Sequence, residues 1–513
     1  MSDPEIIIVG AGVVGTALAY ALSHAGRKVA LLERDLSEPD RIVGELLQPG
    51  GVEALAKLGM VDVLEGIDAT PVEGYCVCNG QDKVKITYPA LEEDGGSELL
   101  EKASKRQWYV PSTSGLKEGR SFHHGRLISG LRRKCINQAP NVMVLEATVK
   151  DLLFCEDTRR VIGVSAAFKS KEGTETKDML APLTIIADGC FSKFRLTPGA
   201  RIPVPDTRSY FVGLILNNAE LPMKNHGTVC LTPSGPVLLY QIGNEKGEVR
   251  MLVDVKGKLP SVADGSLKQY LIDNYLPYIP PNLCNPLRHA LDTQRIRSMP
   301  NSYLPPSIQG LQDSLQGMIL VGDAYNMRHP LTGGGMTVAW HDALLLTEYL
   351  RPGGKLRAKP HEAGLEAGRE GLEDWEPIAE RLREWFWERK KLSGVVNVLS
   401  MALYTLFGGS DRPDLAVLRE GCFKYFELGG DCVAGPVGLL SALTPRPVIL
   451  FYHFFNVAFY SIYLMLLHGP PNRRTGGALG ATWMLPFNLL YSFKVFFTAC
   501  IVLLPYMLRE FWS

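Results

Sequence analysis

The sequence has no excess of either charge and no cluster of metal ligands. Lysine and arginine number 54, aspartate and glutamate also number 54, and this balance gives no general argument for nucleic-acid binding. The ten cysteines are scattered, and the closest pair, Cys76 and Cys78, lacks the spacing of a zinc site. The adjacent His123 and His124 have no third ligand at helical or hairpin spacing. We therefore expect free thiols facing a reducing compartment, no metal centre and no nucleic-acid partner.

We expect no N-terminal targeting segment, and the sequence shows no second nucleotide-binding fingerprint. Residues 1–5 lead directly into a predicted strand, so we expect no signal peptide or N-terminal anchor, and any membrane attachment must come from another segment. With one fingerprint only, a nicotinamide cofactor has no obvious domain of its own. The 513 residues, 46% of them hydrophobic, are enough for two or three domains with real cores.

The fingerprint that is present lies at residues 10–15. A predicted strand at residues 5–10 precedes it, an apolar helical pattern follows it, and a second strand at residues 28–32 ends at an acidic residue, Glu33. Gly10 would permit the tight turn, Gly12 the close approach of a pyrophosphate, and Gly15 the packing of helix against strand. Glu33 would accept hydrogen bonds from ribose hydroxyls and repel a 2′-phosphate. The site suits the adenosine half of FAD or NAD rather than NADP.

A second strand-to-helix corner lies at residues 318–342. The apolar run 318–321 ends in Gly322-Asp323, and three glycines, residues 333–335, precede a helical segment. A carboxylate facing such a helix start can accept from the hydroxyls of a polyol, while backbone N–H groups stabilise negative charge. A flavin presents both features, in its ribityl chain and its reduced ring. Asp188-Gly189 repeats the pattern after the apolar run 184–187 and is a third predicted contact.

The remaining pattern completes a fold prediction. Residues 208–255 alternate apolar and polar side chains, which favours an antiparallel sheet with one face buried. We predict an α/β fold: a Rossmann-like FAD-binding domain, an inserted antiparallel-sheet substrate domain, and a C-terminal helical membrane-associated region. The predicted FAD-binding parts are 1–75, 122–200 and 301–350; residues 76–121 supply substrate-domain strands and a surface insertion, residues 201–300 the substrate sheet, and residues 351–513 the C-terminal region.

The C-terminal region contains long apolar stretches. Residues 380–392 mix arginine and lysine with tryptophan and phenylalanine, a composition that suits a lipid headgroup layer. Residues 448–467 and 485–508 are each long enough to cross a membrane, although His453, Asn456 and Lys494 interrupt them. A hairpin of two spanning helices, helices that lie within one leaflet, and helices buried against the rest of the protein all remain open. Residues 352–372 suggest a linker or an exposed helix.

Several long runs make the chain resemble the squalene epoxidase (squalene monooxygenase) family, of fungal type. The runs are residues 33–36, 38–45, Phe122-His123-His124-Gly125-Arg126, 321–338, 428–430 and 432–440. The resemblance covers the chain from residue 5 onward. It implies a p-hydroxybenzoate-hydroxylase-like flavoprotein that uses O2, through a flavin hydroperoxide, to convert squalene to (S)-2,3-epoxysqualene for sterol (ergosterol) synthesis.

The resemblance also implies residue roles. The FAD contacts carried over are Val13, Val14, Glu33, Arg34, Arg41, Arg132, Val149, Asp323 and Met336. Tyr75 and Tyr240 correspond to tyrosines near the active-site cavity. We expect Tyr75 to orient a polar group near the flavin, with a packing role as the alternative.

Partners and location are implied in the same way. Family members receive electrons from NADPH through a separate microsomal cytochrome reductase, and they sit on the endoplasmic reticulum membrane, with lipid droplets as a second location. Vertebrate members carry an N-terminal anchor that this sequence lacks, so attachment through the C-terminal region alone is expected. Two competing hypotheses share the nucleotide-binding architecture: a flavin-dependent prenyl-lipid reductase and a lipid-escort protein without redox chemistry.

Overall fold

A seven-stranded sheet of mixed direction carries the nucleotide-binding fingerprint. The computed structural model describes residues 3–90, 115–170, 173–244, 246–353, 371–408, 412–469 and 485–511. The sheet has the order β10-β9-β8-β2-β1-β11-β17. Its strands are β1 (Ile6–Val9), β2 (Val29–Glu33), β8 (Val142–Phe154), β9 (Val161–Ser170), β10 (Gly173–Leu180), β11 (Leu183–Ile186) and β17 (Met318–Leu320). The five strands from β8 to β17 are parallel, and β9 and β10 extend the sheet as an antiparallel ribbon.

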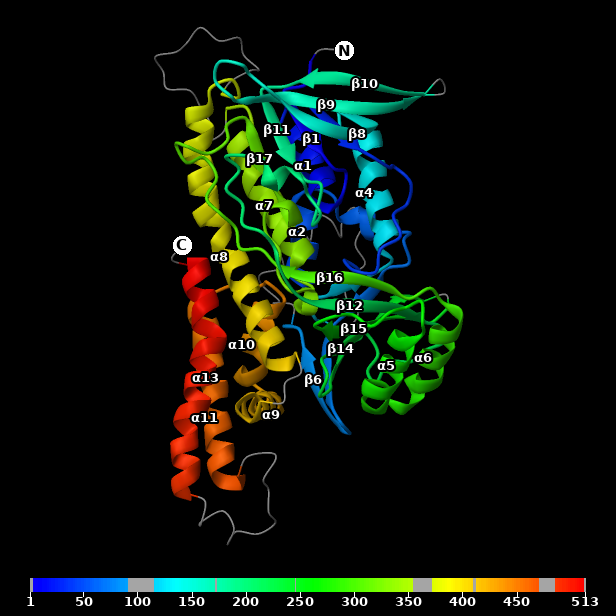
Figure 1. The fold of residues 1–513 in the computed structure, drawn as a ribbon, viewed down its shortest axis with the longest axis vertical. Coiled ribbons are helices and arrows are strands. Elements are labelled where there is room, and N and C mark those ends of the chain that lie inside the picture. Colours follow the sequence, from blue (N-terminus) through cyan, green and yellow to red (C-terminus); the bar gives the residue numbers. More distant parts are fainter. Residues whose placement is uncertain are drawn as a thin grey trace.

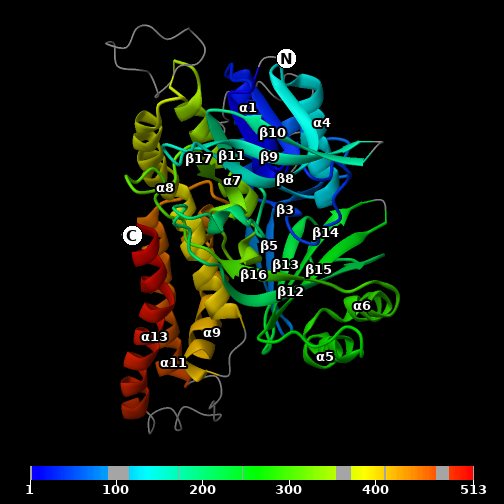
Figure 2. The ribbon, with the colours of Figure 1, turned by 45° about the horizontal axis from the view of Figure 1, so that its top comes forward.

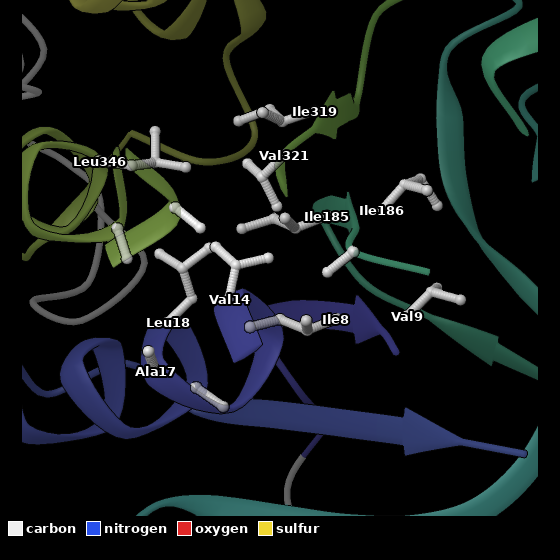
Figure 3. Close-up of a cluster of buried hydrophobic side chains, with 14 of the residues drawn as sticks. Ile8, Val9, Val14, Ala17, Leu18, Ile185, Ile186, Ile319, Val321 and Leu346 are labelled. Atoms are coloured by element: carbon white, nitrogen blue, oxygen red, sulfur yellow. The ribbon is translucent and has the colours of Figure 1, made fainter. Parts of the chain in front are cut away.

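The centre of this sheet is apolar on both faces, as a parallel sheet covered by helices requires. The helices around it are α1 (Val13–His24), α2 (Pro49–Lys57), α4 (His124–Gln138) and α7 (Gly335–Leu350). Helix α1 packs against both α4 and α7. Figure 3 shows side chains of β1, β11, β17, α1 and α7 meeting in one cluster. This cluster fixes the strand ends and helix starts that form the site below.

A second seven-stranded sheet lies beside the first (Figure 1). Its order is β16-β12-β15-β14-β13-β5-β6, and every pair is antiparallel except β13 with β5. The strands are β5 (Gly74–Asn79), β6 (Asp82–Thr87), β12 (Asp206–Leu216), β13 (His226–Leu231), β14 (Val237–Gly243), β15 (Glu248–Lys256) and β16 (Arg297–Tyr303). The expectation of a single buried face was wrong. Helices α5 (Ser266–Asn274) and α6 (Pro281–Thr293) cover one face, and the C-terminal helices cover the other.

A short three-stranded sheet links the two large ones. It consists of β3 (Leu46–Leu47), β7 (Gly119–Ser121) and β4 (Thr70–Val72), with β7 in the middle. Short 3-10 turns complete the fold: η1 (Val61–Leu64), η2 (Phe194–Leu196), η3 (Leu276–Tyr278), η4 (Gly322–Ala324) and η5 (Pro330–Thr332). Residues 91–114 of the expected surface insertion, 354–370 of the expected linker and 470–484 between the two apolar helices lie outside the described residues.

The C-terminal helices run along one side of both sheets (Figures 1 and 2). They are α8 (Trp375–Phe407), α9 (Pro413–Glu427), α10 (Asp431–Leu440), α11 (Pro447–His468) and α13 (Leu485–Phe511). Glycine allows close crossings: a Cβ on Gly421 of α9 would lie 1.8 Å from Oγ of Ser461, and one on Gly394 of α8 would lie 2.8 Å from the Phe511 ring. Small residues at crossings are typical of membrane helix packing.

Helices α11 and α13 are the two that meet the length and hydropathy of membrane spans in the described part of the chain. Only 28% of the apolar window in α11 and 33% of that in α13 is buried. Large apolar side chains are exposed along both helices, among them Phe459 of α11 and Phe493 of α13. Burial against the rest of the protein therefore does not account for these two helices, which are long and apolar enough to cross a membrane.

The basic and aromatic segment at residues 380–392 does not form the exposed layer that its composition suggested. Trp385 and Arg389 are fully buried in α8, and Lys390 is 3% exposed, whereas Trp387 is half exposed. The reason is an acidic partner on another helix: the Arg389 guanidinium bonds both carboxylate oxygens of Asp342 on α7, at 2.9 and 2.7 Å. This part of α8 is a core element.

Candidate functional site

Four parallel strands end at one edge of the first sheet and bring distant sequence segments together there. The Gly10 N–H donates to the Leu32 carbonyl at 2.7 Å, and the Ala187 N–H donates to the Val9 carbonyl at 2.8 Å. The Val321 N–H donates to the Ile186 carbonyl at 3.0 Å. Glu33, Asp188 and Asp323 therefore all follow strands at the carboxyl edge, around the glycine loop after β1. Ligands of open α/β sheets bind at this edge, where the strand order reverses.

The glycine loop has the geometry of a phosphate-binding turn. Gly10 has a φ of 105°, and a Cβ there would lie 2.5 Å from the Ala187 carbonyl oxygen. A Cβ on Gly15 would lie 1.9 Å from the Gly10 oxygen, so both positions require glycine. A Cβ on Gly12 would meet nothing within 4 Å, which leaves open space over the backbone. Helix α1 begins at Val13 and Val14 without a side-chain cap, so its first N–H groups can bind an anion.

Arg132 organises the end of the site beside β2. Its Nε donates to the Ala11 carbonyl and its Nη1 to the Ser37 carbonyl, both at 2.9 Å, and its Nη2 lies 3.3 Å from the Glu33 carboxylate. Burial lowers the pKa of Arg132, and Glu33 opposes that shift. Glu33 also accepts from the Ala11 N–H at 2.8 Å, so the carboxylate is fixed toward the glycine loop.

Three more of the predicted FAD contacts lie on β8 and in the segment after β2. Val149 is buried on β8, three residues past Glu146, which pairs with Glu33. Arg34 is exposed immediately after β2. Arg41 is also exposed, and its charge acts on both Asp323 and Arg132.

Asp188 and Asp323 are joined by an arginine that the sequence did not reveal. Arg195, 5% exposed, donates from Nη2 to the Gly189 carbonyl at 3.2 Å and to the Asp323 carbonyl at 3.1 Å. Burial raises the pKa of both carboxyl groups, and Arg195 opposes the shift in each. Oδ1 of Asp188 has no hydrogen-bond partner among the described residues, and Asp323, although protein surrounds its carboxyl group, is a residue open to solvent. Both carboxylates can therefore accept from a ligand.

The glycine turn before α7 faces the same edge. Gly333 has a φ of 61°, and α7 begins at Gly335 without a side-chain cap, with Met336 buried in its first turn. Trp340 of α7 donates from Nε1 to the Val13 carbonyl at 3.1 Å, so the starts of α1 and α7 lie close together. Two uncapped helix starts thus point toward one region, where they favour negative charge.

Gln48 connects this turn to Tyr75. Its Nε2 donates to the Thr332 carbonyl at 2.6 Å and also to the Tyr75 hydroxyl, while its Oε1 accepts from the Tyr88 hydroxyl at 2.6 Å. The Tyr75 and Tyr88 rings meet edge to face, with centroids 6.0 Å apart. Burial raises the pKa of Tyr75. Gln48 and Tyr88 were not predicted, although a polar Gln between two buried leucines and a Pro-Gly-Gly run is a signal that could have been noticed.

Tyr240 is held by a buried ion pair. Its hydroxyl lies 3.4 Å from Oε2 of Glu45, and Glu45 binds Arg250 through two bonds of 2.7 and 2.8 Å. Tyr75 and Tyr240 both point to the sheet face covered by α8, in a cluster with Leu331, Val398 and other apolar side chains. The two tyrosines therefore lie between the glycine turn and an apolar layer that continues into helices α11 and α13.

The two adjacent histidines have separate roles in packing this loop region. His123 Nε2 lies 2.9 Å from the Glu248 carboxylate, and His124 Nδ1 donates to the Gly44 carbonyl at 2.9 Å. Burial lowers the pKa of His124 to about 4. His124 thereby holds the loop that carries Arg41 and Glu45.

Comparison with known proteins agrees with this geometry. Residues 180–475 match the family model for squalene epoxidase, and residues 5–251 match that for FAD dependent oxidoreductases. Relatives include the squalene epoxidases of Schizosaccharomyces pombe, 41% identical with coverage of 99% of this chain and 98% of the relative, and Candida albicans, 40% identical with the same coverage. In fold, the chain is similar to p-nitrophenol 4-monooxygenase from Pseudomonas putida, with a TM-score of 0.61, 16% identity, and coverage of 88% of this chain and 97% of that one.

Proposed function

Because this chain belongs to the squalene epoxidase family, we propose that it inserts one oxygen atom of O2 into a terminal double bond of squalene. The product is (S)-2,3-epoxysqualene, for sterol synthesis. The observation that carries the proposal is identity of about 40% over nearly the whole length of fungal squalene epoxidases. The structure adds a reason for the substrate class, since an apolar layer joins the candidate site to two exposed apolar helices.

The residues at the sheet edge fit FAD. The open backbone of Gly12 and Gly189 leaves room for a pyrophosphate, and Oδ1 of Asp188, which has no partner among the described residues, and the exposed Asp323 offer acceptors for hydroxyl groups. The start of α1 would hold the phosphates, Glu33 the adenosine ribose, and Asp323, with Arg41 nearby, the ribityl chain. The start of α7 would face the part of the ring that becomes anionic on reduction.

FAD, when bound and reduced, supplies the activated oxygen, so the protein's contribution is binding, orientation and exclusion of water. An isolated alkene has no acidic proton, so the site requires no general base to activate it. Gln48 fixes the glycine turn through the Thr332 carbonyl and holds Tyr75 in place at the same time. Tyr75 and Tyr240 border the layer in which a hydrocarbon would lie, and the apolar side chains there keep water away from the reacting atoms.

The electron source in this proposal is NADPH, acting through a separate microsomal cytochrome reductase. The single dinucleotide fingerprint supports it, because no second one offers a site for NADPH. Helices α11 and α13 would attach the protein to the endoplasmic reticulum membrane, into which squalene partitions.

The decisive experiment is turnover with the purified protein in lipid. The protein should show flavin absorbance and, with squalene, NADPH, a reductase and ¹⁸O2, should yield epoxide carrying one labelled oxygen. A saturated product would indicate the prenyl-lipid reductase instead, and lipid binding without any flavin would indicate the escort protein.

A further inference from the structure

Glu510 is an acidic residue inside the protein at the end of an otherwise apolar helix. Helix α13 has large exposed apolar side chains over most of its length, and Glu510 is the one carboxylate within its bounds. Yet its side chain is fully buried, and α13 enters the protein there through the Phe511–Gly394 crossing with α8. A carboxylate that loses its hydration at this position must be held by partners.

The partners of Glu510 come from both halves of the protein. Oε1 accepts from the Tyr303 hydroxyl of β16 at 3.1 Å and from Nδ2 of Asn397 on α8 at 3.0 Å. Burial raises the pKa of Glu510, and Lys390, also on α8, is the cation that opposes this shift most strongly. Burial lowers the pKa of Lys390 to about 8, and the Glu510 carboxylate opposes that shift.

A short chain of hydrogen bonds then leads from Glu510 to the flavin corner. Nδ2 of Asn397 also donates to Oδ1 of Asn326 at 3.2 Å, and the same oxygen accepts from Nη2 of Arg328 at 2.8 Å. Arg328 faces Asp323, its strongest carboxylate partner, and its Nη1 reaches the Gly335 carbonyl at 3.5 Å. Two side chains, Asn397 and Asn326, thus separate the end of α13 from the arginine that contacts the candidate FAD site.

Glu510 is one of three carboxylates that face the buried cations of this cluster. The cations are Arg328, Arg389 and Lys390, and the carboxylates are Asp342, Glu510 and Asp323, of which Asp323 is shared with Arg41 and Arg195. Asp342 is taken up by its paired bonds to Arg389, so it cannot compensate for a missing charge elsewhere. Without Glu510 the cluster carries one extra positive charge in a region of low dielectric, where charges act over longer distances.

We infer that Glu510 is a positioning residue for the flavin: its charge, delivered by the docked end of α13, sets the orientation of the Asn326–Arg328 segment and the electrostatic potential at the glycine turn. This inference rests on the proposed FAD-dependent function. It makes the correct docking of the end of α13 against α8 and β16 a condition for flavin chemistry, in addition to any role of this helix in membrane attachment.

The test compares Glu510→Gln and Glu510→Ala with Glu427→Gln, which removes a half-exposed carboxylate from the neighbouring helix α9. The full-length protein in lipid nanodiscs is used for FAD titration of the apoprotein, for the reduction potential of bound flavin, and for kcat and KM with squalene. Glu510→Gln preserves the size of the side chain and its acceptor oxygen but not its charge. It should retain flavin, move the potential to more positive values, because reduction adds negative charge, and lower kcat while KM is unchanged.

Glu510→Ala should show the same shift in potential with weaker FAD binding and a kcat lower by roughly a hundredfold, the typical cost of displacing a reacting group by about 1 Å. Glu427→Gln should match the unmodified protein in every readout. The inference is overturned if unmodified protein forms epoxide and Glu510→Gln has the same potential and kcat. Failure of the proposed function is distinct, since the unmodified protein would then form no epoxide.

Discussion

Replacing Arg250 by methionine should strongly destabilise the layer that holds Tyr240. The Arg250 and Glu45 side chains are 5% and 1% exposed and form two bonds of 2.7 and 2.8 Å, so the carboxylate depends on this one guanidinium. The nearest other donor in the described contacts, the Tyr240 hydroxyl, is 3.4 Å away. Removing one member of such a buried pair costs about 3–5 kcal/mol, because it leaves an uncompensated charge in the interior.

The expected change in melting temperature follows from the size of the chain. An unfolding entropy of about 2.1 cal/mol/K per residue gives roughly 1 kcal/mol/K for a cooperative unit of this length, so Arg250→Met should lower Tm by about 3–5 °C. Tryptophan fluorescence during heating of the lipid-bound protein measures this shift. The double variant Glu45→Gln with Arg250→Met removes the stranded charge and should recover most of the loss.

The exposed Asp40–Arg297 pair provides the control. Its side chains are 72% and 38% exposed, so Arg297→Met should move Tm by less than about 1 °C, as expected for a surface ion pair. Equal losses in the Arg250→Met single variant and in the double variant would refute the reasoning, because the cost would then come from lost packing and not from an unpaired Glu45.

Three further outcomes follow from the site. Asp323→Asn removes a charged acceptor that contributes about 1.5–3 kcal/mol, so the affinity for FAD, measured by fluorescence quenching, should weaken roughly 10- to 150-fold. The control Asp292→Asn, at an exposed position of α6, should bind FAD normally, and equal FAD affinity of the two variants would exclude Asp323 as a flavin ligand. Tyr75→Phe leaves the Gln48 amide without one acceptor, at a cost of about 1–3 kcal/mol. If this cost falls on the reacting geometry, kcat should drop by roughly 5- to 150-fold with flavin retained, whereas unchanged turnover would leave Tyr75 a packing role only. Burial lowers the pKa of His124 to about 4, below its usual 6.5, so between these pH values the unfolded chain binds a proton that the folded chain does not. The stabilisation should be complete above pH 6.5 and fall by about 3 kcal/mol as the pH drops toward 4. His124→Gln should flatten this part of a curve of Tm against pH.

The parts of the site that follow from a local sequence pattern were predictable. Gly10 and Glu33 belong to one strand–helix–strand unit, and Asp188 and Asp323 each follow an apolar run, so local pattern alone places all four at strand ends. Parallel pairing of β1 with β11 and of β11 with β17 then brings these ends together. The alternation over residues 208–255 likewise made the central antiparallel strands of the second sheet predictable.

Contacts between distant segments were not predictable. Gln48 meets Thr332 across 284 residues, and Arg195 meets Asp323 across 128, without any periodic signal at either end. The segment around Arg389 was predicted to be an exposed layer because composition alone does not show which helix packs against it. Asp342, 47 residues earlier, is what makes that cation a core residue. The second sheet was taken as half buried for a similar reason, since the helices that cover its far face come from the C-terminal region.

The strand order of the first sheet delays the pairing of its central strands while the chain is being synthesised. Strand β1 is made early, but its neighbour β11 begins at Leu183, and β17, which pairs with β11, begins at Met318. At about 5–20 residues per second, the ribosome takes roughly 15–60 s to pass from Val9 to Met318. During that time first β1 and then β11 presents an unpaired edge that other chains or chaperones can occupy. The growing chain therefore needs protection longest at the strands that later carry the cofactor.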